Sequence, residues 1–293
     1  MELKTTNLSK TYSNGVKALD NVNLEIGTGM FGLLGPNGAG KSSLMRTIST
    51  LQEPDSGSIQ FGDIDVLKQK DEVRKILGYL PQEFGLYPNL KAELILDHFA
   101  VLKGITNSGE RKDTVQALLQ QTNLWDVRKK KVGGYSGGMK QRLGIAIALL
   151  GNPKLVIVDE PTAGLDPTER NRFLNLLGEI GENVVVILST HIVEDVRELC
   201  RKMAVINKGN VLTQGSPDDA IEELSGKIWK RSVDKDQLDA MHTEFEVIST
   251  RLVAGKPLIH IFSESKPDSS FEATDADLED VYFLNIARAT VEA

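Results

Sequence analysis

Tyr135-Ser136-Gly137-Gly138-Met139-Lys140-Gln141-Arg142 opens the stretch of sequence that decides the fold. The stretch continues through an apolar run at residues 155–158 into the acidic pair Asp159-Glu160, and it ends at Gly164-Leu165-Asp166. The apolar run is typical of a parallel strand buried on both faces. A serine and two glycines at a helix start predict a site where backbone N–H groups bind an anion. An anion site therefore precedes an acidic strand end.

A second glycine-rich segment, residues 35–42, matches the phosphate-loop pattern G-x-x-x-x-G-K-[ST]. A short apolar strand is expected before it, and helical spacing of apolar residues predicts a helix from Lys41 onward. In such a loop the backbone N–H groups face phosphate, Lys41 reaches the terminal phosphates, and the Ser42 hydroxyl binds Mg²⁺. The predicted contacts to ATP are Gly35, Pro36, Asn37, Gly38, Ala39, Gly40, Lys41, Ser42 and Ser43.

The acidic pair follows a buried strand, and open α/β sheets bind ligands at the carboxyl ends of their strands. We expect Asp159 to hold Mg²⁺ through water, and Glu160 to accept a proton from the water that attacks ATP. The alternative for two such acids is a solvated strand end without a ligand. The phosphate loop upstream favours the catalytic interpretation.

Strands and helices alternate around the phosphate loop, which predicts an α/β fold with a parallel sheet core. Residues 1–30 are interpreted as an antiparallel β part with a hairpin turn at Asn14-Gly15. Residues 90–153 show helical patterns without strands and are expected to form a helical insert. The pattern changes near residue 216, so we predict one domain at 1–215 and a small C-terminal α+β domain at 216–293.

Composition limits the function classes. The 293 residues hold 34 Lys+Arg against 41 Asp+Glu, a net charge of −7, and only 5% aromatics, so nucleic acid is not an expected partner. A single cysteine, Cys200, suits a reducing compartment. The first residues lack the pattern of a signal peptide. The longest apolar runs fall short of the ~18 residues of a membrane helix, so any transport path is expected to come from another chain.

Taken together, the Ser136 segment, the phosphate loop and the acidic pair resemble the ATP-binding subunit of an ATP-binding-cassette (ABC) transporter over about residues 2–215. The resemblance implies a P-loop ABC ATPase cassette. In that family Ser136, Gly137 and Gly138 would grip the terminal phosphate of ATP bound to the opposite subunit. The family's most common signature has Leu and Gln where this chain has Tyr135 and Met139, and a methionine cannot make the amide contacts of Gln.

The resemblance also assigns roles to residues outside these motifs. Gln82 fits the loop that touches Mg²⁺ and the attacking water, and His191 fits the switch histidine that donates a hydrogen bond to the γ-phosphate. Tyr12 fits an aromatic that stacks on adenine, although an edge-strand tyrosine is an alternative. Asp166 fits a loop between the two subunits and can equally cap the next helix. Residues 84–87 either face a membrane partner or tuck into the core.

Asp277-Leu278-Glu279-Asp280-Val281 near the end looks most like the exporter-type branch. The resemblance therefore implies ATP hydrolysis by a dimer, with a second ATP-binding subunit expected to be identical. A separate permease chain would hold the protein at the cytoplasmic face of the cell membrane and carry out export. The alternative is a soluble ABC ATPase that clamps nucleic acid or ribosomes. The 54 residues between Gln82 and Ser136 (136 − 82) are too few for the long coiled-coil arm typical of such clamps.

Overall fold

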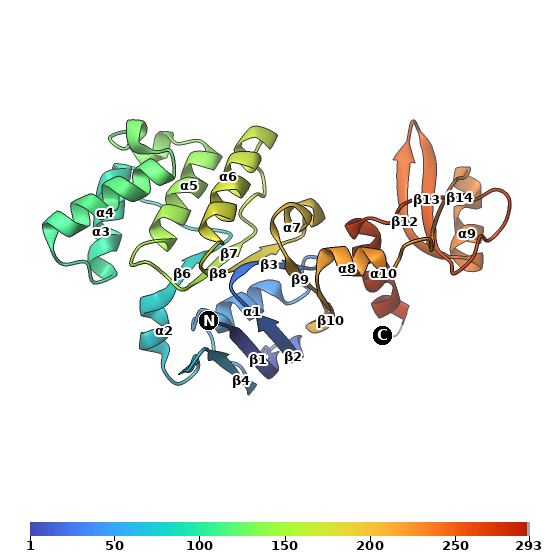
Figure 1. Cartoon of the computed structure of the whole chain (residues 1–293), viewed down its shortest axis with the longest axis horizontal. Coiled ribbons are helices and arrows are strands. Elements are labelled where there is room, and N and C mark those ends of the chain that lie inside the picture. The colour runs from blue at the N-terminus through green and yellow to red at the C-terminus, as the bar shows by residue number, and fades with distance from the viewer. Residues whose placement is uncertain (292–293) are drawn as a thin grey trace.

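A six-stranded central sheet organises the chain in the computed structural model, which describes residues 1–291 (Figure 1). The strand order is β10-β9-β3-β8-β7-β6, and every pair is parallel except β9 with β10. The predicted parallel core is confirmed, with one antiparallel strand added at its edge. The strands are β3 (Gly29–Leu34), β6 (Leu77–Leu80), β7 (Leu155–Asp159), β8 (Val185–Thr190), β9 (Lys202–Asn207) and β10 (Asn210–Gly215).

A four-stranded antiparallel sheet lies beside the first, in the order β2-β1-β4-β5. Its strands are β1 (Leu3–Thr11), β2 (Lys17–Ile26), β4 (Ser56–Phe61) and β5 (Ile64–Asp65), and α2 (Lys70–Ile76) connects it to β6. Helix α1 (Lys41–Ile48) shares one buried apolar cluster with strands of both sheets. Because α1 begins immediately after the loop that follows β3, its N-terminus is fixed at the carboxyl end of the central sheet.

The helical insert has a core of its own. It contains α3 (Ala92–Leu102), α4 (Ser108–Gln121), the 3₁₀ turns η1 (Trp125–Val127) and η2 (Val132–Gly134), and α5 (Gly137–Ala148). Helix α5 also packs against β6, so it attaches the insert to the central sheet. Two further helices, α6 (Pro167–Ile180) and α7 (Val193–Leu199), cover that sheet and connect its strands.

Residues 216–291 form a third sheet and four helical segments, seen at the right of Figure 1. The antiparallel sheet has the order β12-β13-β11-β14. Helix α10 packs on α7, β9 and β10, and it shares the apolar cluster of the central sheet. The division after residue 215 stays a prediction. The elements are α8 (Pro217–Glu222), β11 (Ile228–Ser232), η3 (Lys235–Gln237), α9 (Leu238–Glu244), β12 (Glu246–Val253), β13 (Lys256–Phe262), β14 (Glu272–Ala273) and α10 (Leu278–Val291).

Within residues 1–291, no helix combines the length and the apolar character needed to cross a membrane.

Candidate functional site

The phosphate loop joins β3 to α1 and depends on glycine at its end. Gly40 has φ 108° and serves as the N-cap of α1, and a Cβ there would lie 2.3 Å from the carbonyl oxygen of Ala18. Only glycine combines that backbone conformation with so close an approach. No side chain in the described part of the chain caps α1. The N–H groups at its first turn are therefore available to an anion, as predicted for a phosphate.

Lys41 is held at the base of this loop by three contacts. Its Nζ donates to the carbonyl oxygens of Gly35 at 2.6 Å and Pro36 at 3.3 Å, and it lies 3.2 Å from Oε1 of Glu160. Both Lys41 and Glu160 are buried, with about 6% and 5% of the side chain exposed. The loop lysine and the predicted catalytic carboxylate are thus in contact, although 119 residues (160 − 41) separate them.

Asp159 ends β7 with a carboxylate that lacks a full set of partners. Its side chain is buried, and its Oδ1 has no hydrogen-bond donor. Burial raises the pKa of Asp159 above its ordinary value, and the hydroxyls of Ser189 and Ser42 offset part of that rise. A bound cation would supply the missing partner and favour the charged carboxylate.

Three predicted ligands suit Mg²⁺: the Ser42 hydroxyl contacts the Asp159 carboxylate, and Gln82 lines the same cavity as Ser42. A hydroxyl from Ser42, a carboxylate from Asp159 and an amide oxygen from Gln82 are hard ligands, which Mg²⁺ prefers together with substrate phosphates. Residues 1–291 contain no cluster of three or more His, Cys, Asp or Glu side chains that could hold a metal by themselves. The set is therefore suited to a Mg²⁺ ion that shares its coordination with ATP.

Glu160 follows with an unusual backbone. Its φ is 48°, in the left-handed region that few non-glycine residues adopt, and its N–H donates to the carbonyl of Ser189 at 2.8 Å. Its Oε2 lies 2.6 Å from Nδ1 of His191. Strained conformations of this kind cluster at active sites. The structure brings Glu160, His191 and Lys41 together, as expected for the nucleotide site.

Tyr12 and residues 36–43, which are part of the predicted nucleotide contacts, line one cavity of about 460 Å³, whereas Gly35 does not line it. Tyr12 lies at this cavity and is 37% exposed, and its hydroxyl hydrogen-bonds to Ser43 Oγ at 3.0 Å and Gln52 Oε1 at 3.1 Å. An exposed, tethered ring suits stacking on adenine, and that role stays a prediction. The lining residues are Tyr12, Val16, Ala18, Gln82, Glu160 and residues 36–43.

Ser136, Gly137, Gly138 and Asp166 do not line that cavity. Ser136 is exposed and caps α5, where its Oγ accepts a hydrogen bond from the N–H of Met139 at 3.2 Å. Asp166 caps α6 by accepting from the N–H of Glu169 at 3.0 Å. The capping role of Asp166 is thus observed, whereas contacts from either segment to a nucleotide stay predictions.

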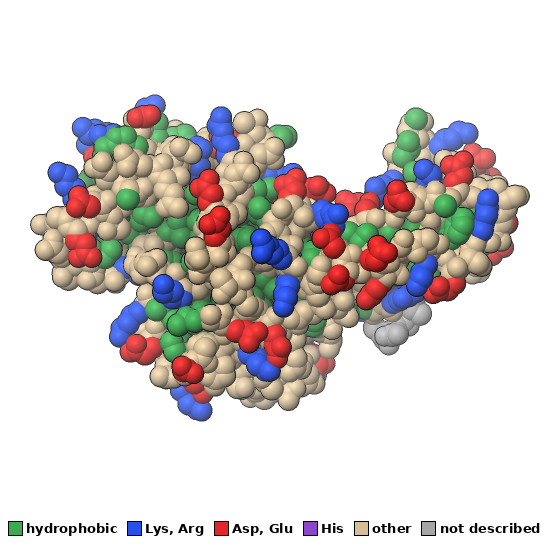
Figure 2. All heavy atoms as spheres, viewed as in Figure 1, with side chains coloured by type: hydrophobic (Ala, Val, Ile, Leu, Met, Phe, Trp, Pro, Cys, Tyr) green, Lys and Arg blue, Asp and Glu red, His purple; other side chains and the backbone are tan. Residues whose placement is uncertain are grey.

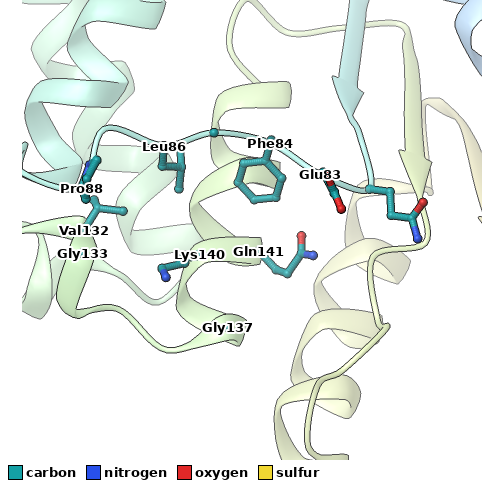
Figure 3. A pocket seen from close by; sticks show the side chains of 11 residues that line it. Glu83, Phe84, Leu86, Pro88, Val132, Gly133, Gly137, Lys140 and Gln141 are labelled. Carbon is teal, nitrogen blue, oxygen red and sulfur yellow. The ribbon is translucent and has the colours of Figure 1, made fainter.

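A groove of about 630 Å³ lies between the loop after Gln82 and α5 (Figure 3). Phe84 points from the loop toward α5, and a Cβ added at Gly144 would lie 2.7 Å from its ring. Phe84 and Leu86 are half-buried, whereas Tyr87 is 59% exposed. Phe84 and Leu86 thus tuck partly into the protein and Tyr87 faces outward, whereas contact of this loop with a membrane partner stays a prediction.

Ser189 is a site residue that sequence analysis did not single out. It lies at the end of β8, fully buried, and pairs with Asp159 across the parallel strands. Its position two residues before His191 at a strand end was the available signal.

Comparison with known proteins adds independent findings. A protein-family model described as ABC transporter matches residues 19–163. The chain is 39% identical over 197 residues to the probable multidrug ABC transporter ATP-binding protein YbhF of Escherichia coli (strain K12), covering 67% of this chain and 34% of YbhF. The chain thus spans about a third of the length of that relative.

Two other relatives differ in coverage and in name. The uncharacterized ABC transporter ATP-binding protein YxlF of Bacillus subtilis (strain 168) is 31% identical over 296 residues, covering 96% of this chain and 98% of YxlF. The methionine import ATP-binding protein MetN of Histophilus somni (strain 129Pt) is 36% identical over 229 residues, covering 74% of this chain and 66% of MetN. Proteins similar to this chain thus include one named for import, so similarity alone does not establish export.

A solved structure has a similar fold. It is a dimeric ATP-binding cassette in a post-hydrolysis state, bound to ADP and phosphate, and it superposes with a TM-score of 0.66 at 29% sequence identity. The match covers 73% of this chain and 98% of that one.

Proposed function

The chain belongs to the ABC transporter family of ATP-binding proteins, whose cassettes hydrolyse ATP, and from this premise we propose that two copies of it sandwich ATP to power transport through a separate permease chain. The observation that carries the proposal is the placement of the Ser136 segment. It is exposed and lies outside the cavity of its own phosphate loop. In the proposed sandwich, a second subunit therefore supplies this segment to each nucleotide.

At each composite site the residues of one chain would bind the nucleotide and move a proton. The phosphate loop and Lys41 would bind the phosphates. Ser42, Asp159 and Gln82 would hold Mg²⁺, which supplies charge stabilisation to the transferred phosphoryl group. Glu160 would accept the proton of the attacking water. His191, 2.6 Å from Glu160, would orient that carboxylate and donate to the γ-phosphate.

The opposite subunit would complete the site with Ser136 and the two glycines, whose N–H groups point at the same phosphate. Loss of the bond between the β- and γ-phosphates would weaken this shared contact and let the two subunits separate. For such a switch, ATP must favour the closed pair over ADP by a few kcal/mol.

A complementation experiment tests the sandwich. Lys41→Ala should disable the phosphate loop of the chain that carries it. Ser136→Arg should leave that loop intact and disable only the contact to the nucleotide bound by the opposite subunit. Each variant alone should be inactive. A mixture should regain ATPase activity, because one of the two composite sites in a mixed dimer is intact. Mixed variants that stay inactive, although both fold and both dimerise, would contradict the proposal.

The groove beside Gln82 supports a permease partner. Its apolar floor, Phe84 and Leu86, and its polar wall, Lys140 and Gln141, leave room for a short segment of another chain (Figure 3). Movement there would reach the nucleotide directly, since Gln82 lines both the groove and the cavity. Attachment at this groove would hold the chain at the cytoplasmic face of the membrane.

Export is the proposed direction. It is supported by the segment at residues 277–281 and by the similarity to YbhF, which is named as a probable multidrug transporter component. The chain should be expressed together with a membrane protein encoded beside its gene, and ATP-dependent movement should be measured in membrane vesicles of both orientations. Accumulation in inside-out vesicles is expected for export, and accumulation in right-side-out vesicles loaded with ATP would contradict it.

Nucleic acid is not a proposed partner. Acidic and basic side chains are interspersed over the face seen in Figure 2, and the net charge is −7. A clamp on nucleic acid would need a basic surface.

A further inference from the structure

A buried polar cluster lies behind the nucleotide site. Asp195, in the first turn of α7, is fully buried, and each of its carboxylate oxygens has its own partner. Oδ2 accepts a hydrogen bond from Thr162 Oγ1 at 2.6 Å, and Oδ1 accepts one from Arg170 Nε at 2.7 Å. A buried carboxylate is tolerated only with partners of this kind. We refer to Thr162, Arg170 and Asp195 as the Asp195 cluster.

The cluster lies where the backbone pairing of the central sheet stops. Strands β7 and β8 pair as far as Asp159 with Ser189, and Glu160 adds one N–H bond to Ser189. Beyond that point the two chain segments diverge, one toward α6 and the other toward α7. The bond from Thr162 to Asp195 links them again, two residues after Glu160 and four residues after His191.

His191 needs this link because packing does not hold it. Its side chain is 48% exposed, and its Nδ1 contacts the carboxylate of Glu160. Its position is therefore set by the backbone before and after it. On one side is β8, and on the other is α7, whose first turn is fixed by Asp195.

We propose that Asp195 is a positioning residue for ATP hydrolysis, which holds the Glu160 segment and the His191 segment at a fixed separation through Thr162. Arg170 extends the same link to the first turn of α6, which follows Asp166. The inference rests on the catalytic roles proposed above for Glu160 and His191. Reacting groups tolerate little displacement, so a loosened link slows hydrolysis without weakening ATP binding.

Thr162→Val tests the link because valine keeps the shape of threonine and removes only the donor. Single-turnover hydrolysis of ATP should slow about 5- to 10-fold, which corresponds to the net loss of about one hydrogen bond. The dissociation constant for ATP should stay within about two-fold. Thr162→Ser, which retains the hydroxyl, should restore the rate to within about two-fold of the unmodified chain.

Thr122→Val is the matched control. Thr122 is also fully buried, and its hydroxyl donates to the carbonyl of Leu118 at 2.8 Å inside the helical insert. This variant should lose stability but keep its rate of hydrolysis. An equal loss of rate in Thr122→Val and Thr162→Val would reduce the cluster to a structural role and overturn the inference.

A double-mutant cycle with His191→Ala gives the second readout. If Thr162 acts by positioning His191 against Glu160, Thr162→Val should cause no further loss in a chain that already lacks the histidine. The inference would be overturned if Thr162→Val slowed hydrolysis by the same factor with His191 present and with His191→Ala. An unchanged hydrolysis rate in Thr162→Val alone would also overturn it. If Thr162→Val does not fold, Arg170→Lys takes its place in the cycle, because lysine keeps the charge but not the Nε contact.

Two single variants separate this inference from the proposed function. Glu160→Gln and His191→Ala must each abolish most of the hydrolysis if the proposed roles are right, whatever Thr162→Val does. Full activity in those two variants would contradict the proposed function. If both are inactive but Thr162→Val hydrolyses ATP at the unmodified rate, only the positioning role is contradicted.

Discussion

At the scale of single residues, Asp159 has a cost in stability that its proposed function explains. Burial raises its pKa in the folded chain, so the folded state holds the proton more tightly than the unfolded state. The contribution of Asp159 to the free energy of unfolding is therefore most favourable below the ordinary pKa of an aspartate, and it decreases as the pH rises through the raised pKa. Asp159→Asn carries no charge to desolvate. Without nucleotide, its Tm should exceed that of the unmodified chain at pH 7.5, and the difference should shrink as the pH falls toward 4.

Asp65→Asn is the control of opposite sign. A hydrogen bond from the side chain of Lys68 lowers the pKa of Asp65, so its charge favours the folded state at neutral pH and is lost as the pH falls. Asp65→Asn should thus lower Tm at pH 7.5. A Tm of Asp159→Asn below that of the unmodified chain at pH 7.5 would mean that the charged carboxylate stabilises the fold.

Glu160→Gln should separate binding from hydrolysis. The amide keeps the size of the side chain, and Lys41 keeps its contacts with the carbonyls of Gly35 and Pro36. ATP should therefore still bind, while turnover falls at least roughly 100-fold, the low end for loss of a general base. Dimers held together by ATP should accumulate in gel filtration. Glu194→Gln, at an exposed position on α7, should behave like the unmodified chain. Normal turnover in Glu160→Gln would remove Glu160 from its proposed role.

At the scale of elements, the patterns of the sequence predicted the buried strand at residues 155–158, which is part of β7, and the start of α1 at Lys41, and both are confirmed. They could be predicted because the local spacing of apolar residues decides such elements. Helices α2 and α9, each of seven residues, were not predicted, since about two turns carry little periodic signal. The left-handed backbone of Glu160 and the contacts of Asp195 were also beyond prediction, because they depend on which segments meet in space.

Gly138 decides how closely α5 approaches α6. A Cβ at Gly138 would lie 2.3 Å from Oε2 and 3.0 Å from Cβ of Glu169, whose carboxylate lies 3.4 Å from Arg142 of α5. Gly138→Ala should therefore force the helices apart and lower the free energy of unfolding by about 1–3 kcal/mol, the usual effect of overpacking. ATP turnover should also fall, since the exposed Ser136 segment moves with α5.

Gly134→Ala is the matched control for this prediction. No atom lies within 4 Å of a Cβ at Gly134, and its φ is not in the left-handed region. The variant should match the unmodified chain in both thermal unfolding and turnover. A Gly138→Ala variant with the same stability as Gly134→Ala would show that the two helices have room to separate.

At the scale of the whole molecule, the C-terminal part that we predicted as a separate domain shares an apolar core with the central sheet. The third sheet and α9 enclose their own apolar cluster, which includes Met241, Ile259 and Phe271. Helix α10 instead contributes Val281 and Tyr282 to the cluster of the central sheet. The sequence could not predict this, because the apolar face of α10 is equally suited to either core. We therefore expect the cassette and the C-terminal part to unfold together.

The two tryptophans allow that expectation to be tested. Trp125 reports on the helical insert and Trp229 on β11 of the third sheet, so single-tryptophan variants made with phenylalanine follow each part separately. Their unfolding midpoints should coincide.

Tyr282→Ala, at a position only 8% exposed, should lower the free energy of unfolding by about 3–5 kcal/mol, the range for large aromatic side chains in a core. Because α10 links both parts, both midpoints should shift by the same amount. Leu252→Ser, at the 69% exposed tip of the β12–β13 hairpin, should shift neither. Two separate transitions, with only the Trp229 signal responding to Tyr282→Ala, would show that the cassette holds its fold without α10.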